Sequence, residues 1–333
     1  MLRFFTIIIN HGFYKIFLIL NKQLYYSQNL ILKTNGTSTL LSAIGKFFGV
    51  FIEDLNKWIP VLFILNLCCL LCCFFIKNIY LFILCRNLQG FISGIQTSIA
   101  IGSSAYKGKE GFANWHTIST FVSIFTIISL SIFSLNTVIV GLLSCATLGI
   151  FTKAEKKKVD TTISTNIMNL KVSIVFWINS ILLGCFLGLA LCVISQQQSI
   201  LYEYFNFSLS KSIIFTILPF ITSFLISTCK YFHNRYVAII FLILSFLITL
   251  NIYGFFIGVC SIYGLFAIWN PILNEEILFI EDVYVASTYT NVIRSIITSI
   301  ITFFTLHIKF YYIPFYLLIL ILIDFLKAYY NKY

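Results

Sequence analysis

Charged residues are scarce in this chain: of 333 residues only 10% are Asp, Glu, Lys or Arg, whereas 59% are hydrophobic. A water-soluble protein of this size needs many more polar side chains to cover its surface, so the composition excludes a soluble globular protein. The shortage of charge instead predicts an integral membrane protein that crosses the lipid bilayer several times.

Acidic residues are the rarer of the charged types, with 11 Asp and Glu against 22 Lys and Arg. None lies near the middle of an expected membrane span: Asp324 is close to one end of the last span, and the others are in loops or at span ends. A transporter that couples its solute to protons usually needs an ionisable carboxylate inside the membrane. If this chain is a transporter, facilitated diffusion and exchange therefore remain open beside proton coupling.

Signatures of enzymes and cofactor sites are also missing. The chain has no Gly-rich phosphate loop, no HExxH helix and no G-x-S-x-G elbow. Cys68, Cys69, Cys72 and Cys73 share one side of an apolar segment, but no His or carboxylate accompanies them, so they are expected to be packing residues. We therefore expect no enzymatic activity, no cofactor and no metal.

Long apolar segments make up most of the chain. Each is long enough to cross the bilayer as a helix, which takes about 20 residues. The first 20 residues lack a signal-peptide cleavage site and are taken as the first span. The sequence predicts an all-α membrane protein of about twelve transmembrane helices, with ten or eleven still open; the expected spans are 2–20, 37–52, 59–76, 79–104, 112–133, 135–152, 172–195, 211–229, 236–253, 254–271, 288–307 and 310–326.

The basic residues orient these spans. With both termini cytoplasmic, thirteen Lys and Arg fall in inside segments and five in outside segments, as the positive-inside rule requires. The net charge of +11 thus reflects topology. It does not indicate nucleic-acid binding, because no soluble domain is present to carry a basic face.

A polar insert at 151–166 divides the spans into six and six. We expect an N-terminal six-helix half at 1–152, a basic cytoplasmic linker at 153–171 and a C-terminal six-helix half at 172–333. A lipid-headgroup site in the linker is the less favoured interpretation of its lysines. Two parallel six-helix repeats are an arrangement used by secondary transporters.

Arg86 lies within the apolar segment 79–104. An arginine at the bilayer centre costs about 2.5–3.5 kcal/mol on insertion scales, so it is rarely kept without a partner or a task. Gln89, Gly90 and Gly94 follow it at helical spacing and share its face, and the two glycines form a close-packing seam. This face combines a buried charge with tight helix contact.

The sequence from Arg86 to Gly90, followed by Gly94, resembles the fourth-helix signature of the drug:proton antiporter branch of the major facilitator superfamily. The loop from Gly49 to Trp58 resembles, in degenerate form, the family's loop between helices two and three. Glu53 stands where the family usually has Asp, and Lys57 is the survivor of a basic pair.

The resemblance implies alternating access between two halves, with a role in proton transfer for Arg86. It implies that Gly49 allows close helix approach and that Glu53 and Lys57 belong to a cytoplasmic latch between conformations. The antiporter branch also has a Gly- and Pro-rich fifth helix, which residues 112–133 lack. A purely structural role for Arg86 and an ordinary interfacial loop at 49–58 remain open.

The other charges within the expected spans are positive as well: Lys15, Lys46 and Arg294. Cations without carboxylate partners favour an anionic substrate. In the tenth span, Tyr263, Trp269 and Asn270 precede a proline and are candidates for the cavity wall, although a kinked helix ending in an aromatic belt would give the same pattern.

We therefore expect a secondary transporter that moves a small solute by alternating access, by either proton-coupled efflux or metabolite exchange, with an anion as the candidate solute. The alternative is a non-transporting integral membrane subunit or scaffold. The abundance of Phe, Ile, Asn, Lys and Tyr suggests an AT-rich genome, and the plasma (inner) membrane is the expected location. Lipid and the solute are the expected partners, and protons are a candidate partner.

Overall fold

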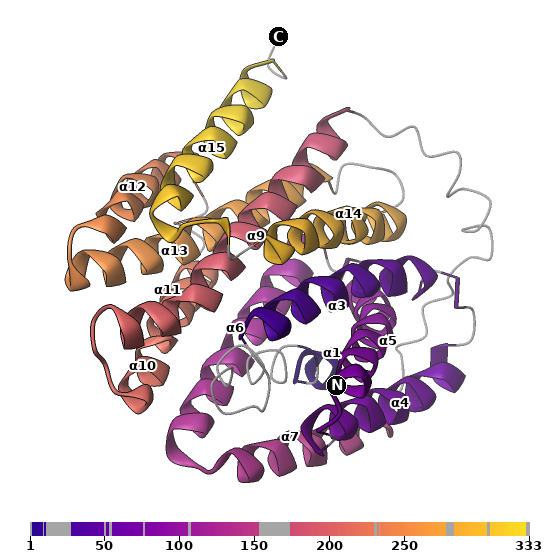
Figure 1. Ribbon diagram of the computed structural model, residues 1–333. Coiled ribbons are helices and arrows are strands. Elements are labelled where there is room, and N and C mark those ends of the chain that lie inside the picture. Colours follow the sequence, from indigo (N-terminus) through magenta and orange to yellow (C-terminus); the bar gives the residue numbers. More distant parts are fainter. Residues whose placement is uncertain are drawn as a thin grey trace.

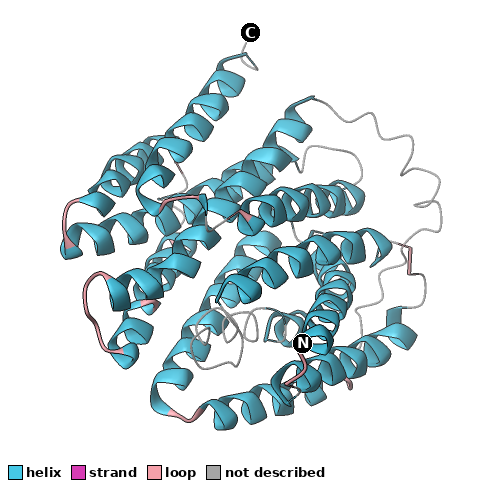
Figure 2. Ribbon diagram, viewed as in Figure 1, coloured by secondary structure: helices cyan, strands magenta, loops and turns pink. Residues whose placement is uncertain are grey.

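The computed structural model describes residues 2–8, 10, 28–49, 51–52, 55–75, 77–105, 108–152, 174–229, 232, 234–277, 283–304 and 307–330. Helices make up the described part of the chain and no strand occurs in it (Figure 2). Each of the twelve expected spans overlaps at least one of these helices, so the all-α prediction is confirmed.

The first half contains six helices in the described ranges: α1 (Leu2–Ile7), α3 (Gln28–Gly49), α4 (Leu55–Phe75), α5 (Ile79–Ala105), α6 (Gly108–Ile132) and α7 (Leu135–Gly149). The second half contains α9 (Ile174–Glu203), α10 (Leu209–Phe215), α11 (Ile217–Thr228), α12 (Arg235–Ser245), η4 (Phe246–Thr249), α13 (Ile252–Ile277), α14 (Val283–Phe303), η6 (Phe310–Tyr312) and α15 (Ile313–Tyr330).

Several helix boundaries differ from those expected. The second expected span was placed at 37–52, but α3 begins at Gln28, and the seventh was placed at 172–195, but α9 continues to Glu203. Polar residues in the first part of α3, such as Asn35, are buried against other helices, so tertiary packing overrides their local preference. The tenth was placed at 254–271, yet α13 continues through Pro271 to Ile277. The predicted linker at 153–171 lies outside the described residues.

The break between α6 and α7 falls where the sequence indicated it. Ser134 is the N-cap of α7, and its hydroxyl accepts a hydrogen bond from the Thr137 backbone N–H at 3.3 Å. A capped N–H that would otherwise be unpaired stabilises a helix start. One apolar run thereby becomes two helices.

Each half has its own apolar core. One buried cluster comes mainly from α9 to α13 and α15, and the other from α1, α4, α5, α6 and α7. Helices α3 and α14 contribute no buried residue to either cluster and pack against each other between them (Figure 1). This arrangement places two polar helices at the junction of the halves.

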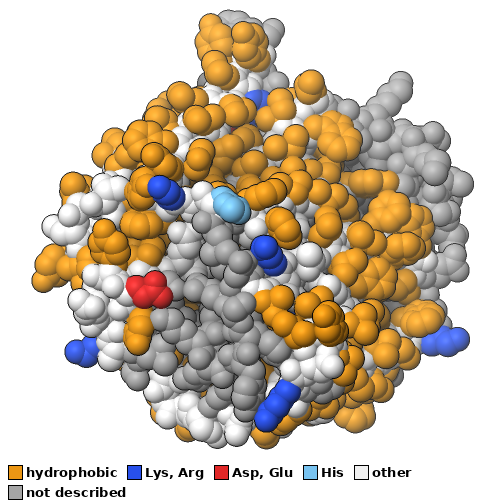
Figure 3. Space-filling view, in the orientation of Figure 1, with side chains coloured by type: hydrophobic (Ala, Val, Ile, Leu, Met, Phe, Trp, Pro, Cys, Tyr) orange, Lys and Arg blue, Asp and Glu red, His pale blue; other side chains and the backbone are white. Residues whose placement is uncertain are grey.

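Six helical segments in the described part of the chain are long and apolar enough to cross a membrane. Helices α3, α5 and α14 also exceed 18 residues but are not among the six. Hydrophobic side chains cover much of the face drawn in Figure 3, with few charges among them. The protein is therefore an integral, multi-pass membrane protein.

Helices α3 and α5 pack at backbone distance. A Cβ atom added at Gly90 would overlap the Ser38 carbonyl, and one added at Gly94 would overlap that of Ser42. On the other helix, a Cβ at Gly45 would overlap the Phe91 carbonyl. The predicted glycine seam of α5 is thus met by a reciprocal glycine on α3, as small-residue interfaces between membrane helices require.

Candidate functional site

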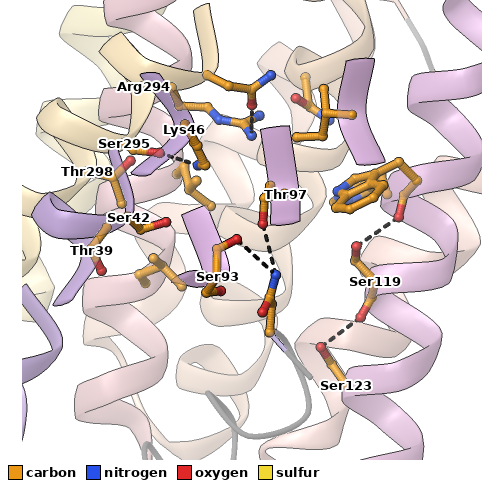
Figure 4. Close-up of a pocket in the computed structure, with 18 of the residues that line it drawn as sticks. Thr39, Ser42, Lys46, Ser93, Thr97, Ser119, Ser123, Arg294, Ser295 and Thr298 are labelled. Atoms are coloured by element: carbon orange, nitrogen blue, oxygen red, sulfur yellow. Dashed lines mark hydrogen bonds between the residues drawn. The ribbon is translucent and has the colours of Figure 1, made fainter. Parts of the chain in front are cut away.

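A cavity of about 260 Å³ lies between the two halves. Its walls come from α3, α5 and α6 of the first half and from α9, α11, α13 and α14 of the second, and part of it is drawn in Figure 4. The described lining residues are Asn10, Ser38, Thr39, Ser42, Lys46, Arg86, Gln89, Gly90, Ser93, Thr97, Ile101, Trp115, His116, Ser119, Thr120, Ser123, Leu187, Leu191, Phe220, Ser223, Tyr263, Phe266, Asn270, Asn274, Asn291, Arg294, Ser295 and Thr298.

One side of the cavity is basic. Lys46 of α3, Arg86 of α5 and Arg294 of α14 line it, and no described lining residue is Asp or Glu. Lys46 does not extend to the membrane surface: it is buried and donates a hydrogen bond to the Ser295 hydroxyl. Cations kept inside a membrane protein without a carboxylate nearby favour an anion as their partner.

Lys46 and Arg294 come from opposite halves. In Figure 4 the Arg294 side chain lies beside that of Lys46, close enough for the two charges to interact. Arg294 donates a hydrogen bond to the Asn291 side chain one turn earlier on α14, while its Nε atom is buried without a hydrogen-bond partner among the described residues.

Arg86 is held from two helices. It donates to the side-chain oxygen of Gln89 on its own helix and, at 3.2 Å, to that of Asn35 on α3. The Ser38 hydroxyl of α3 in turn donates to the Arg86 carbonyl at 3.0 Å. Arg86 therefore both lines the cavity and ties α5 to α3, and its role in transport stays a prediction.

The opposite side of the cavity is aromatic. His116 of α6 meets Phe266 of α13 edge-to-face, with ring centroids 5.5 Å apart, and Phe220 of α11 meets Tyr263 in the same way at 5.3 Å. Trp115 also lines this side. Such rings offer apolar contact and edge-to-face partners to a flat portion of a solute.

Hydroxyl groups line the rest of α6. Ser119, Thr120 and Ser123 each donate to the backbone carbonyl four residues earlier, at 2.8 to 2.9 Å. Because the donor of each is used within the helix, the hydroxyl oxygens remain as acceptors toward the cavity. Acceptors of this kind suit the N–H and O–H groups of a polar solute.

The predicted site residues fall into separate groups. Gln89, Gly90, Tyr263 and Asn270 line the cavity, whereas Gly94 is confined to the α3 contact. Trp269 is fully buried and stacks on Phe186 at 5.6 Å, away from the lining.

Helical geometry explains this division. Residues seven apart, such as Tyr263 and Asn270, share a helix face, whereas Trp269 points to another.

The proposed latch is only partly described. Gly49 is buried, and an added Cβ would press on Ser98 of α5, in keeping with close helix approach. Lys57 is exposed in the first turn of α4. Glu53 and Lys15 lie outside the described residues. The latch therefore stays a prediction.

Several lining residues were missed at the sequence level, among them Ser38, Ser42, Ser119, Ser123 and Thr298. Their spacing could have indicated a shared polar face, since Ser38 and Ser42, and likewise Ser119 and Ser123, lie four residues apart on one helix. Asn66 and Gln96, which also seemed suited to a cavity, instead bond each other across α4 and α5 at 2.7 Å.

A second group of charges is buried away from the cavity. Asp324 of α15 is fully buried and pairs with Arg235 of α12 at 2.8 Å and with Lys327 at 2.7 Å. Lys327 also donates to the side chain of Asn179 on α9. All four residues belong to the second half, so the group joins three of its helices without crossing to the first.

Comparison with known proteins gives matches at the level of structure. No protein-family model and no curated protein sequence matches the chain. The fold is similar to that of the nucleoside transporter NupG (TM-score 0.64, 14% identity, 96% of each chain covered) and of a variant of it (0.68, 15%, 96% of each).

The fold is also similar to that of the human organic anion transporter MFSD10, or TETRAN (TM-score 0.69, 12% identity, 96% of this chain and 97% of that chain covered). These matches cover nearly the whole chain in a single alignment. The chain therefore shares its fold with these transporters over nearly its whole length.

Proposed function

We propose that the protein is a secondary transporter that moves a small organic anion through the central cavity by alternating access. The carrying observation is the cavity itself, which lies between the halves and is lined by Lys46, Arg86 and Arg294 with no described carboxylate. The similarity in fold to the human organic anion transporter MFSD10 supports the proposal.

The charge pattern supports an anionic solute on energetic grounds. A buried cation that lacks an opposite charge carries a desolvation cost of several kcal/mol. An anionic solute entering the cavity offsets part of this cost, whereas a cationic solute adds to it. The aromatic and hydroxyl-lined sides would contact the uncharged portion of the same solute.

Polar contacts between the halves support alternating access. Lys46 bonds Ser295 and Ser299 bonds the Gly36 carbonyl at the α3–α14 junction, and His116 meets Ser223 at the α6–α11 junction. Hydrogen bonds of this kind can separate and re-form as the halves rock. Inverted or parallel repeats that rock about a midplane site are the general design of such transporters.

Proteoliposome uptake tests the proposal. Purified protein is reconstituted and offered labelled anionic, cationic and neutral metabolites, with and without an imposed pH gradient. We expect uptake of anionic members, reduced about tenfold or more by Arg86→Gln. Lys309→Gln removes one exposed charge outside the cavity and serves as the matched control.

Each outcome of the uptake experiment decides a point. Uptake that requires the pH gradient would establish proton coupling, and uptake without it would establish facilitated diffusion or exchange. Transport of cations in preference to anions would contradict the anionic solute. No flux of any compound from correctly folded protein would favour a non-transporting membrane subunit.

A further inference from the structure

The junction of α3 and α14 brings basic side chains of both halves to one wall of the cavity. Lys46 and Arg294 lie side by side there (Figure 4). Arg86, the third basic residue of the lining, is instead tied to Gln89 and Asn35 within the first half. Lys46 and Arg294 are therefore the pair whose separation depends on how the halves are placed.

Neither side chain uses all its hydrogen-bond donors. An ammonium group has three donors and a guanidinium five, yet Lys46 makes one hydrogen bond, to Ser295, and Arg294 one, to Asn291, within the described part of the chain. The Arg294 Nε atom is buried without a partner there. Donors from both residues are available to a shared acceptor.

Two protonated side chains this close repel each other, and the repulsion is strong where water is sparse. An oxyanion between them would turn the repulsion into two attractions and would accept the remaining donors. Arg in particular binds the planar edge of a carboxylate or phosphate with two parallel hydrogen bonds. The hydroxyl of Ser42 also lines the cavity and can donate to a further oxygen of the anion.

We propose that Lys46 and Arg294 form one anion-binding site that bridges the two halves and takes a phosphate or carboxylate group. The inference rests on the proposed function only in that the group belongs either to the transported solute or to a free inorganic anion. In either case the anion stabilises the contact between α3 and α14, and its departure weakens that contact.

Equilibrium binding of labelled inorganic phosphate and acetate to purified protein tests the site without any transport step. We expect saturable binding of at least one of the two anions, weakened about tenfold or more by Lys46→Gln and by Arg294→Gln. Because one anion contacts both residues, each single change should weaken all of the bound anion, and neither variant should keep a fraction that binds as tightly as before. Lys309→Gln is expected to bind as the unmodified protein does.

Charge-conserving variants protect the test against misfolding. Lys46→Arg and Arg294→Lys should retain measurable binding and elute as monodisperse protein in size-exclusion chromatography. The proposal is overturned if the unmodified protein binds neither anion, or if folded Lys46→Gln and Arg294→Gln variants bind within about twofold of it. Loss of about half of the bound anion in each single variant, with the other half bound as tightly as before, would also overturn it, because that result indicates two separate sites.

The source of the anion is resolved by counterflow in proteoliposomes. Labelled phosphate that enters liposomes preloaded with unlabelled phosphate shows that the site holds the transported solute. Phosphate that binds and accelerates uptake of another solute without crossing shows a resident co-ion. If the variants lose anion binding and no compound crosses the membrane, the result supports the anion site and contradicts the transporter proposal. If compounds cross the membrane and the variants bind the anion normally, the result supports the transporter proposal and contradicts the anion site.

Discussion

His116 of α6 lies 3.1 Å from the hydroxyl of Ser223 on α11, within hydrogen-bond distance and across the boundary between the halves. The Lys46 contact with Ser295 joins α3 to α14 in the same way. Helix α6 is the fifth span of the first half, and it meets α11, the second span of the second half. Helix α3 is the second span of the first half, and it meets α14, the fifth span of the second half. The two contacts are therefore equivalent under a two-fold relation between the halves.

The α6 to α11 contact should adjust the balance between conformations. His116→Phe keeps a ring beside Phe266 but removes the hydrogen bond to Ser223, and Ser223→Ala removes the same bond from the other side. Polar contacts between membrane helices contribute about 0.6 kcal/mol on average, which corresponds to about a threefold shift in population. Spin-label distances between α6 and α11 measure that shift.

The double variant provides the control for this contact. If the hydrogen bond is the shared cause, His116→Phe with Ser223→Ala should shift the distances no further than either change alone. Two shifts that add would contradict this account.

The glycine seam should be intolerant of a single methyl group. Gly94→Ala places a Cβ onto the Ser42 carbonyl, and such overpacking typically costs 1 to 3 kcal/mol. Gly141 of α7 has no atom within 4 Å of its Cβ position, so Gly141→Ala should be neutral or stabilising by up to about 1 kcal/mol. Thermal unfolding in detergent compares them, and equal melting temperatures would refute the tight seam.

The buried charges of the second half should stabilise the fold. Asp324→Asn leaves Arg235 and Lys327 without their shared carboxylate, and breaking a buried ion pair costs about 3 to 5 kcal/mol. We expect a much lower melting temperature, partly restored when Lys327→Met is added. A double variant no more stable than Asp324→Asn would argue against a charge-based cause.

Arg86 should require its guanidinium as well as its charge. Lysine cannot reach Gln89 and Asn35 in the same fork-like geometry, so Arg86→Lys is expected to lose uptake nearly as much as Arg86→Gln, by about tenfold. Initial uptake rates in proteoliposomes measure this loss. Normal uptake rates in Arg86→Lys would show that only the positive charge at this position is needed, which would contradict a requirement for the guanidinium group.

Much of the architecture could be predicted because bilayer thickness constrains span length and because hydrophobic runs are interrupted by recognisable caps. The capping Ser134 divided α6 from α7 correctly. The start of α3 was missed because Thr34, Asn35 and Gly36 have loop-like preferences. Their burial between α5 and α14 depends on contacts with distant segments, which local sequence does not encode.

The charged residues of the candidate site could be predicted from the sequence, because a charge within an apolar span is unusual. Lys46, Arg86 and Arg294 stood out as intramembrane cations and all line the cavity. Serine and threonine did not stand out, because their hydroxyls can bond the preceding turn in any membrane helix. Which of them face the solute depends on how the helices are rotated, and that is decided by packing.

The close contact between α3 and α5 has a mechanical consequence. Helices in backbone contact move together. If the halves rock as proposed, Lys46 and Arg86 should keep a constant separation, whereas the distance from Lys46 to Arg294 should change. A covalent cross-link between α3 and α5 should therefore leave turnover intact, while one between α3 and α14 should arrest it. On this proposal the first half holds two charges at a fixed separation, and only their distances to Arg294 of the second half vary.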